Sequence, residues 1–301
     1  MNSLKQRVLA TMKSRDVESD FELYVTRTPG YLWALLFRRL NVHPITVTLL
    51  GIVIGCASAF FFYADDLRSN LIGMLLLLWA NWYDCADGQL ARMTGKRTLV
   101  GRVLDGFAGD AWFFCIYLAF LLRFWPQWGI AIFLLEAWSG LHCHTRQCAL
   151  GDYYRNVHLW AVLGQERSEL DSSVQQKQRM QSLRWCSKDW FEKLYLFFYV
   201  RYTHSQEEQT PEFQRLRPLM EKLPLNDPLR MQFRLESLPI MPLSNIITFD
   251  TRFIVLFLSI IVGRPWLYFM FEATVLEAVR YYARYRHEAF CRKFYQILSA
   301  A

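Results

Sequence analysis

Two long apolar runs constrain the fold of this chain more than any other feature. They read ITVTLLGIVIGCASAFFFYA from Ile45 and LIGMLLLLWANW from Leu71. Runs this apolar are typical of helices that cross a bilayer. With four weaker runs, the candidate spans are Ile45–Ala64, Leu71 to about Arg92, Gly101–Leu122, Trp128 to about His144, Ile246–Val262 and Trp266 to about Tyr282. A soluble all-helical protein is the alternative, and the hydropathy of the first two runs argues against it.

Basic residues are distributed unevenly over the connections between these spans. Three connections on one side contain Arg68, Arg123 and Arg264 as their only basic residues, and nearly all other lysines and arginines lie on the opposite side. Positive charge gathers on the cytoplasmic side of membrane proteins, and the short 92–102 connection carries four such residues. The pattern predicts an integral membrane protein with both termini in the cytoplasm.

The segments outside the spans divide the chain into four regions. In the N-terminal region, Tyr31–Leu40 combines aromatic residues and leucines with two arginines, which predicts an amphipathic helix at the membrane interface. The predicted regions are a cytoplasmic segment (1–44), spans one to four (45–148), a cytoplasmic insertion (149–245), and spans five and six with a C-terminal tail (246–301). The fold class that follows is an all-α polytopic membrane protein with six transmembrane helices.

Four aspartates lie at the cytoplasmic ends of spans two and three. Asp84 and Asp87 are three residues apart and share one helix face, while Asp105 and Asp110 follow on the next span. Because span two runs toward the cytoplasm and span three away from it, the four carboxylates are expected at one depth. Clustered carboxylates in a low-dielectric site repel one another unless a cation compensates them. Their hard oxygen atoms suit Mg²⁺, Mn²⁺ or Ca²⁺, and two such ions can clamp a phosphoryl displacement.

The residues around these acids favour a phosphate-bearing ligand. Gly88 leaves room for a ligand to approach the backbone, and Arg92, one turn further on, can bind a phosphate. The alternative is a purely structural set of ion pairs between the acids and Arg92, Arg97 and Arg102. The net charge of +7 would also suit nucleic acid, but the membrane spans favour the lipid bilayer and a phosphorylated substrate over that partner.

This segment resembles the signature of the CDP-alcohol phosphotransferase (CDP-alcohol phosphatidyltransferase) family. That signature reads Asp-x2-Asp-Gly-x2-Ala-Arg, eight or nine residues, then Gly-x3-Asp-x3-Asp. The matching positions are Asp84, Asp87, Gly88, Ala91, Arg92, Gly101 and Asp105. Pro44 and Thr48 are similar to the family's Pro-Asn-x-x-Thr motif at the start of span one, with Ile45 in place of Asn. The six-span layout and the interfacial helix also resemble the family, whereas the 149–245 insertion does not.

The resemblance implies a membrane enzyme of phospholipid or related lipid synthesis. Such an enzyme displaces CMP from a CDP-linked lipid donor, usually CDP-diacylglycerol, by an alcohol hydroxyl. The cofactors implied are two divalent ions, Mg²⁺ or Mn²⁺, on the cytoplasmic side, and a homodimer is a further expectation. The roles implied are metal ligation by Asp84, Asp87 and Asp105, and nucleotide binding by Gly88, Ala91, Arg92 and Thr48.

The last aspartate of the signature, which would be both metal ligand and general base, is displaced here. Gly109 occupies its position, and Asp110 comes one residue later. On a regular α-helix, Asp110 is rotated by about 140° from Asp105 and would face away from the other acids. A π-turn between them would return Asp110 to the site, and such turns concentrate at functional positions. We therefore predict a π-turn here, with Asp110 as metal ligand and catalytic base.

Two weaker constellations follow span four. Arg146 and Arg155 are expected at the cytoplasmic level of the acids, where they could bind an anionic acceptor or lipid headgroups. They favour inositol or inositol phosphate among alcohol and sugar-phosphate acceptors. His142, Cys143, His144 and Cys148 include metal-ligand types, but on a helix they point to different faces, so packing is expected rather than a zinc site.

Two other function classes remain alternatives at this point. Gly109 allows a membrane binding or scaffold protein that keeps the fold and has weakened catalysis. A cation transporter would explain the acids but not the glycines or Arg92, and the sequence contains no pair of broken helices. Release of CMP from a CDP-linked lipid would distinguish the enzyme from both.

Overall fold

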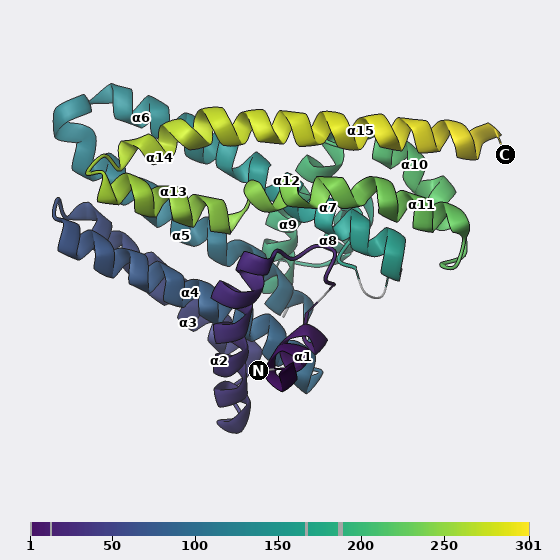
Figure 1. Cartoon of the computed structure of the whole chain (residues 1–301), viewed down its shortest axis with the longest axis horizontal. Coiled ribbons are helices and arrows are strands. Elements are labelled where there is room, and N and C mark those ends of the chain that lie inside the picture. Colours follow the sequence, from purple (N-terminus) through teal and green to yellow (C-terminus); the bar gives the residue numbers. More distant parts are fainter. Residues whose placement is uncertain (1, 13, 166–167, 186–188, 301) are drawn as a thin grey trace. The chain divides into compact units, whose positions relative to one another are not determined.

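The structure is a computed structural model that describes residues 2–12, 14–165, 168–185 and 189–300. Within these residues the chain is helical throughout, with α-helices, short π-helical segments and no strand (Figure 1). The predicted all-α fold is confirmed. Contacts group the chain into two compact units, Met1–Thr145 with Arg252–Ala273, and Arg146–Thr251 with Thr274–Ala301.

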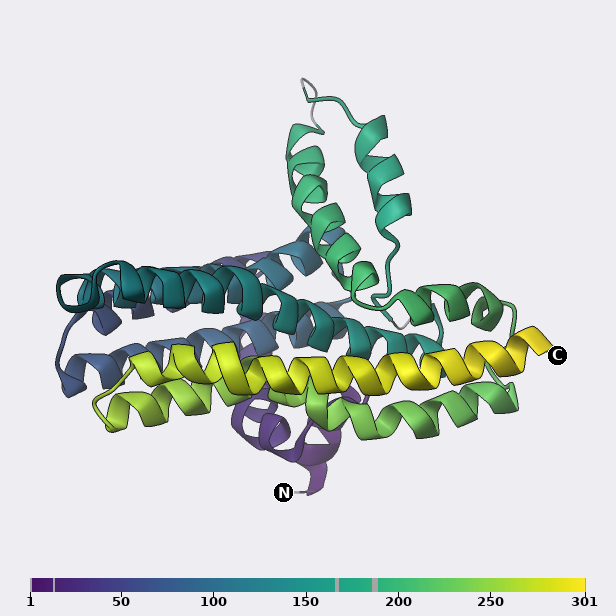
Figure 2. The ribbon, with the colours of Figure 1, turned by 90° about the horizontal axis from the view of Figure 1, so that it is seen from above.

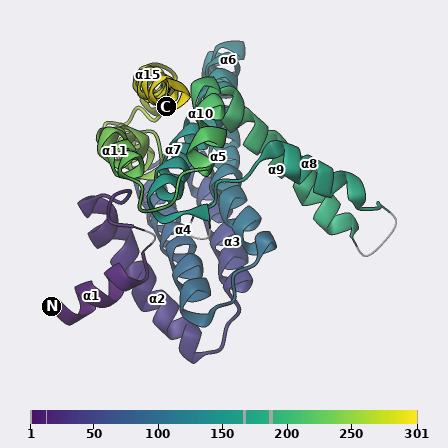
Figure 3. The ribbon, with the colours of Figure 1, turned by 90° about the vertical axis from the view of Figure 1, so that its right-hand side faces the viewer.

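The first unit is built around three long helices that pack on one another. They are α3 (Pro44–Tyr63), α4 (Leu67–Thr94) and α5 (Leu99–Trp128). Contacts between α3 and α4 and between α3 and α5 hold this bundle together (Figure 3). The further helical elements of this unit are α1 (Asn2–Ala10), η1 (Glu22–Arg27), α2 (Thr28–Arg39), α6 (Ile130–Glu136), η2 (Ala137–His144), α14 (Trp266–Phe271), most of α13 (Phe249–Ile261) and the first two residues of η5 (Glu272–Leu276).

Local sequence signals set the ends of the long helices. The side chain of Asp66 accepts a hydrogen bond from the Ser69 N–H at the start of α4. Gly95, at a φ of 69°, ends α4 in the left-handed conformation that favours glycine. Three residues later the Thr98 hydroxyl accepts from the Gly101 N–H and begins α5. This short connection places the last turns of α4 beside the first turns of α5.

The second unit contains the insertion and the C-terminal helix. Its elements are α7 (Thr145–Leu163), α8 (Ser173–Ser182), α9 (Trp190–Glu208), α10 (Pro211–Glu221), α11 (Pro228–Ser237), η4 (Leu238–Ile240), α12 (Met241–Ile246) and α15 (Glu277–Ala300). Helices α8 and α9 lie side by side as a hairpin (Figure 2). Helix α15 packs against α10, α11 and α12. The amphipathic stretch at residues 185–202, WCSKDWFEKLYLFFYVRY, falls partly on residues outside the described part of the chain and otherwise on α9.

Three described segments are long and apolar enough to cross a membrane, and the third begins before the predicted start of span five at Ile246. These are Pro44–Tyr63, Val100–Trp128 and Pro228–Ile261. Helix α4, predicted as span two, has a polar C-terminal part and is not among them. Apolar helices of this length indicate an integral membrane protein. The count of six spans stays a prediction.

The helix predicted at the membrane interface is present as α2. Its buried face carries Ala34 and Phe37, which pack on Val47, Tyr83, Ala86 and Leu90 of α3 and α4. Its opposite face exposes Leu32, Leu36 and, just beyond its end, Leu40. Gly30 allows the close approach to α4, since a Cβ there would lie 2.7 Å from the Cβ of Cys85. The membrane-surface position of α2 stays a prediction.

Close packing between α3 and α5 depends on Gly55. A Cβ at this position would lie 2.3 Å from the buried indole of Trp112. We expect Gly55→Ala to lower the free energy of unfolding by roughly 1–3 kcal/mol, because a well-packed core accommodates an added methyl group poorly. Gly109→Ala on α5 is the control, since nothing lies within 4 Å of its added Cβ. Thermal unfolding in detergent measures both, and equal stability of the two variants would contradict the packing argument.

Candidate active site

Three of the predicted acids converge where α4 meets α5. One carboxylate oxygen from each of Asp84, Asp87 and Asp105 lies within 4.8 Å of the other two. Asp84 and Asp87 come from adjacent turns of α4, and Asp105 comes from the second turn of α5. Asp87 is buried, Asp84 is half-buried and Asp105 is exposed. The convergence predicted from the sequence is therefore present for three of the four carboxylates.

The buried carboxylate is held by the first turns of α3. The Thr48 hydroxyl donates a hydrogen bond to Oδ2 of Asp87, and it also contacts the carbonyl of Pro44 at 3.2 Å. Thr48 is itself 3% exposed. A hydrogen bond from a buried hydroxyl orients the carboxylate and offsets part of its desolvation cost. This contact adds α3 to the two helices that form the site.

The donor set fits a hard divalent cation. Three carboxylates this close repel one another strongly in a partly buried site, and they offer only oxygen atoms as ligands. Mg²⁺ and Mn²⁺ prefer such oxygen ligands, and the exposed Asp105 leaves the group open on one side. The residues present are thus those that a divalent ion would require.

The guanidinium of Arg92 lies over Gly88, which precedes it by one turn of α4. A Cβ at Gly88 would lie 3.3 Å from Nη1 of Arg92, so the guanidinium occupies space above Gly88. The Nε of Arg92 also donates to the carbonyl of Thr11 at 2.5 Å. Ala91, beside it, is half-buried. Arg92 therefore has a structural contact with the N-terminal segment that the sequence did not indicate.

The predicted π-turn between Asp105 and Asp110 is wrong. Helix α5 is α-helical from Leu99 to Trp128, so Asp110 is rotated away from Asp105 as a regular helix requires. Asp110 does not belong to the group of three, and its Oδ1 lies 4.0 Å from Nε2 of His144. Gly106 and Gly109 permit a distortion but do not impose one, because the intact hydrogen bonds of an α-helix are the more stable arrangement. We therefore withdraw the roles of metal ligand and base for Asp110.

Comparison with known proteins agrees with this geometry. Residues 41–149 match the family model of the CDP-alcohol phosphatidyltransferases, and this range contains α3, α4, α5 and all three clustered acids. This part of the chain is a CDP-alcohol phosphatidyltransferase domain. No curated protein and no solved structure matches the chain. The match indicates phosphotransferase activity for this domain.

The two arginines predicted to bind the acceptor lie in the second unit, Arg146 within the family-matched range 41–149 and Arg155 beyond it. Arg155 is half-buried and donates to Oδ1 of Asn245 from Nε at 3.0 Å and from Nη2 at 2.6 Å. Its Nη2 also donates to the Thr248 hydroxyl at 3.2 Å. Arg146 is exposed at the start of α7. Their role toward an acceptor stays a prediction.

The sequence analysis did not predict a buried polar network in the first unit. Glu272 and Arg252 are fully buried and form an ion pair at 2.9 Å, and His144 contacts Glu272 at the same distance. His144 was expected to be ordinary packing. The signal that could have revealed the network is the presence of Arg252 and Glu272 inside predicted spans, where ionisable side chains are costly and usually paired.

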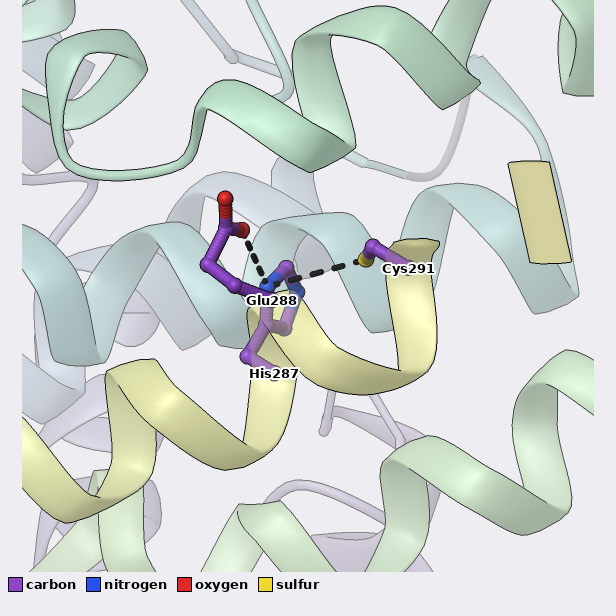
Figure 4. A group of neighbouring side chains, drawn as sticks. All are labelled: His287, Glu288 and Cys291. Carbon is purple, nitrogen blue, oxygen red and sulfur yellow. Dashed lines mark hydrogen bonds and ion pairs between the residues drawn. The ribbon is translucent and has the colours of Figure 1, made fainter. Parts of the chain in front are cut away.

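A second group of metal-ligand residue types lies on α15. His287 Nδ1 is 3.2 Å from Oε1 of Glu288 and 3.7 Å from Sγ of Cys291 (Figure 4). Burial raises the pKa of the Cys291 thiol, and the nearby Glu288 and Glu212 raise it further, so the metal-binding thiolate is disfavoured. Oε2 of Glu288 is already bound to the backbone N–H of Glu212. This group fits a packed core interaction better than a metal site.

The His287 side chain makes stability depend on pH. Burial lowers the pKa of its imidazole, and Glu288 offsets this only in part. At pH 7.5 the ring is neutral in both states, but below about pH 6.5 the unfolded chain takes up a proton that the folded chain excludes. His287 should therefore lower the free energy of unfolding as the pH falls from 7 to 5.5.

The test compares the pH dependence of unfolding in wild type and His287→Phe. Phenylalanine keeps the stacking of this ring on Tyr154, whose centroid lies 4.1 Å away. The variant should lose less stability than wild type on acidification. The exposed His204 provides the control variant His204→Gln, which should behave as wild type. Identical acid sensitivity of wild type and His287→Phe would contradict the assignment.

Proposed function

We propose that this protein transfers the phosphatidyl part of a CDP-linked lipid, with CDP-diacylglycerol as the expected donor, to an alcohol acceptor. The observation that carries the proposal is the convergence of Asp84, Asp87 and Asp105 within 4.8 Å inside the domain matched by the family. The products are CMP and a phospholipid or related lipid. Inositol or inositol phosphate is the acceptor that Arg146 and Arg155 favour.

Different residues of the site would bind the metal ions and the nucleotide. Asp84, Asp87 and Asp105 would hold two divalent ions, Mg²⁺ or Mn²⁺. Bound there, the ions would neutralise charge on the diphosphate during its displacement. The Thr48 hydroxyl, which orients Asp87, comes from α3, and the guanidinium of Arg92 comes from α4, the helix that carries Asp84 and Asp87.

The nucleotide part of the donor would lie along Gly88, Ala91 and Arg92. Thr48 was also predicted to bind nucleotide, and its bond to Asp87 supports a positioning role in the site. We further propose that this site faces the cytoplasm, with both chain termini on that side, because positive charge concentrates there.

A second candidate function is a membrane binding or scaffold protein that has weakened catalysis. It is favoured by Gly109 at the position of the signature's last aspartate and by the regular α-helix that directs Asp110 elsewhere. Both candidates predict nucleotide binding. Only the enzyme releases CMP from the CDP-linked lipid when an acceptor is added.

The first test replaces each clustered acid by its amide. Asp84→Asn, Asp87→Asn and Asp105→Asn should each lower CMP release from CDP-diacylglycerol by roughly 10²-fold or more, since each removes a charge that stabilises the metal-bound transition state. Release is measured with purified protein in detergent, Mg²⁺ or Mn²⁺, and a panel of myo-inositol, inositol 1-phosphate, glycerol 3-phosphate and serine.

Asp66→Asn is the matched control for this series. Asp66 is the N-cap of the same helix α4, outside the acid group, and asparagine caps helices as well as aspartate does. The control should retain wild-type release. Wild-type rates in any of the three site variants would remove that residue from the metal site, and no CMP release by wild type with any acceptor would favour the scaffold function.

Arg92 should contribute to nucleotide affinity. Arg92→Ala is expected to weaken CDP binding by roughly 10- to 100-fold, the usual effect of losing a hydrogen bond to a charged group. Since Arg92 also binds the Thr11 carbonyl, unfolding of the variant is measured in parallel. Arg97→Ala, an exposed arginine of the same connection, is the control. CDP affinity unchanged by Arg92→Ala would place the nucleotide elsewhere.

A further inference from the structure

Helix α9 has an apolar stripe that is exposed in the described part of the second unit. The stripe consists of five residues that are 37–62% exposed, namely Trp190, Phe191, Leu194, Phe197 and Phe198. At about 100° per residue these positions fall within roughly 120° of the helix circumference, so they form one continuous face. Single apolar side chains on a surface are ordinary, whereas a contiguous exposed group of this kind marks an interaction site.

The opposite face of α9 attaches the helix to its own unit. Tyr195, Leu196, Thr203 and Gln206 are buried on that face. Nε2 of Gln206 donates a hydrogen bond to the carbonyl of Ala149 on α7 at 3.0 Å. Helix α8 packs along α9, and the stripe lies on the half of α9 that is remote from α10 (Figure 2). The stripe is therefore not needed to hold the α8–α9 hairpin in place.

Positive charge accompanies the stripe. Residues 173–201, from the start of α8 through the stripe, contain six basic and two acidic residues, which gives a net charge of +4. One of the two acids, Glu192, pairs with Arg179 of α8. Glu207 and Glu208 lie at the other end of α9. A surface with this excess of positive charge is complementary to an anionic partner.

Two basic side chains border the stripe and lie against aromatic rings. The guanidinium carbon of Arg201 is 4.5 Å from the ring centroid of Phe197. The ammonium of Lys193 is 5.3 Å from the centroid of the exposed Trp185, and it also donates to the carbonyl of Leu183. Such side chains cover apolar surface with their hydrocarbon stems and keep their charge at a polar boundary. Apolar and charged groups therefore alternate here over a short distance, as they do where lipid headgroups meet acyl chains.

We propose that the stripe of α9 lies in the surface of an anionic bilayer, with its aromatic rings at the boundary between headgroups and acyl chains. A helix with large apolar side chains on one face and basic residues at its borders is typical of interfacial binding. Aromatic side chains concentrate at this boundary in membrane proteins. The stripe covers residues 190–198 only, far fewer than the roughly 20 that a transmembrane helix needs.

A lipid surface fits the stripe better than a protein partner does. The apolar helices of this chain indicate an integral membrane protein, so a bilayer is within reach without any diffusing partner. The hairpin belongs to the insertion, beyond the family-matched range 41–149. It would therefore supply a membrane contact in addition to those of the matched domain. The cytoplasmic leaflet carries the negative surface charge that its basic residues complement.

A photoreactive residue tests this contact directly. The analogue p-benzoylphenylalanine replaces Phe198 in the full-length protein, which is reconstituted into nanodiscs of phosphatidylcholine alone or mixed with phosphatidylglycerol. Phe198 is 62% exposed, so the analogue should not disturb folding. Irradiation should give lipid adducts in mass spectra of the protein, and more of them with phosphatidylglycerol. The same analogue at Lys222, an exposed residue at the end of α10, is the control and should give few adducts.

The contribution of charge is tested with Arg201→Gln in the protein that carries the analogue at position 198. This change should lower the adduct yield in anionic nanodiscs by up to about fivefold, the effect of one basic residue on binding to such a surface. Arg215→Gln is the matched control and should leave the yield unchanged. Arg215 is exposed on α10, and its guanidinium carbon lies 5.6 Å from the ring centroid of Tyr295.

Three results would overturn the inference. The first is the absence of lipid adducts at position 198 in both lipid mixtures, or a yield no higher than at position 222. The second is an equal yield with and without phosphatidylglycerol. The third is cross-linking from position 198 to a second copy of the chain in place of lipid, which would make the stripe an interface between copies. None of these measurements depends on CMP release, so the inference and the proposed function can fail separately.

Discussion

Repulsion between carboxylates is the constraint on which the arrangement of the first unit depends. Asp84, Asp87 and Asp105 lie within 4.8 Å of one another, although charges of one sign at such distances oppose folding unless they are compensated. Close packing between the helices nevertheless brings these three carboxylates together. Gly55 lets α3 approach α5, Gly30 lets α2 approach α4, and Thr48 holds the one carboxylate that is buried. An arrangement that costs this much stability is expected where a ligand later supplies the missing positive charge.

The other buried charges discussed for this unit are neutralised by protein partners and not by a ligand. Glu272, Arg252 and His144 satisfy one another with protein partners, so this network is complete without a ligand. A complete network is held rigidly by its own partners. The acid group is therefore the part of this unit that depends on a ligand, whereas the Glu272 network does not.

Several features followed from local sequence because they depend on spacing along one helix. The three-residue interval between Asp84 and Asp87 is a local signal, and the opposite directions of the two successive spans placed Asp105 at the same depth as these acids. The apolar runs likewise indicated helices at the positions where α3, α4 and α5 occur. Where the sequence prediction relied on an unusual local conformation, at the π-turn before Asp110, it was wrong. Glycines lower the cost of such a turn, but a distortion forms only where contacts with other segments stabilise it.

The sequence by itself determined the all-helical class, the three acids and their family signature. Each of these follows from short-range periodicity or from the fixed spacing of a motif. Only the tertiary structure decided that Asp110 faces His144, that Arg92 binds the Thr11 carbonyl, and that residues 128 positions apart, His144 and Glu272, share a hydrogen bond. The π-helical segments of η2 and η5 also belong to this second group. The physical reason is that these contacts join segments distant in sequence, and their geometry depends on how whole helices pack rather than on any local pattern.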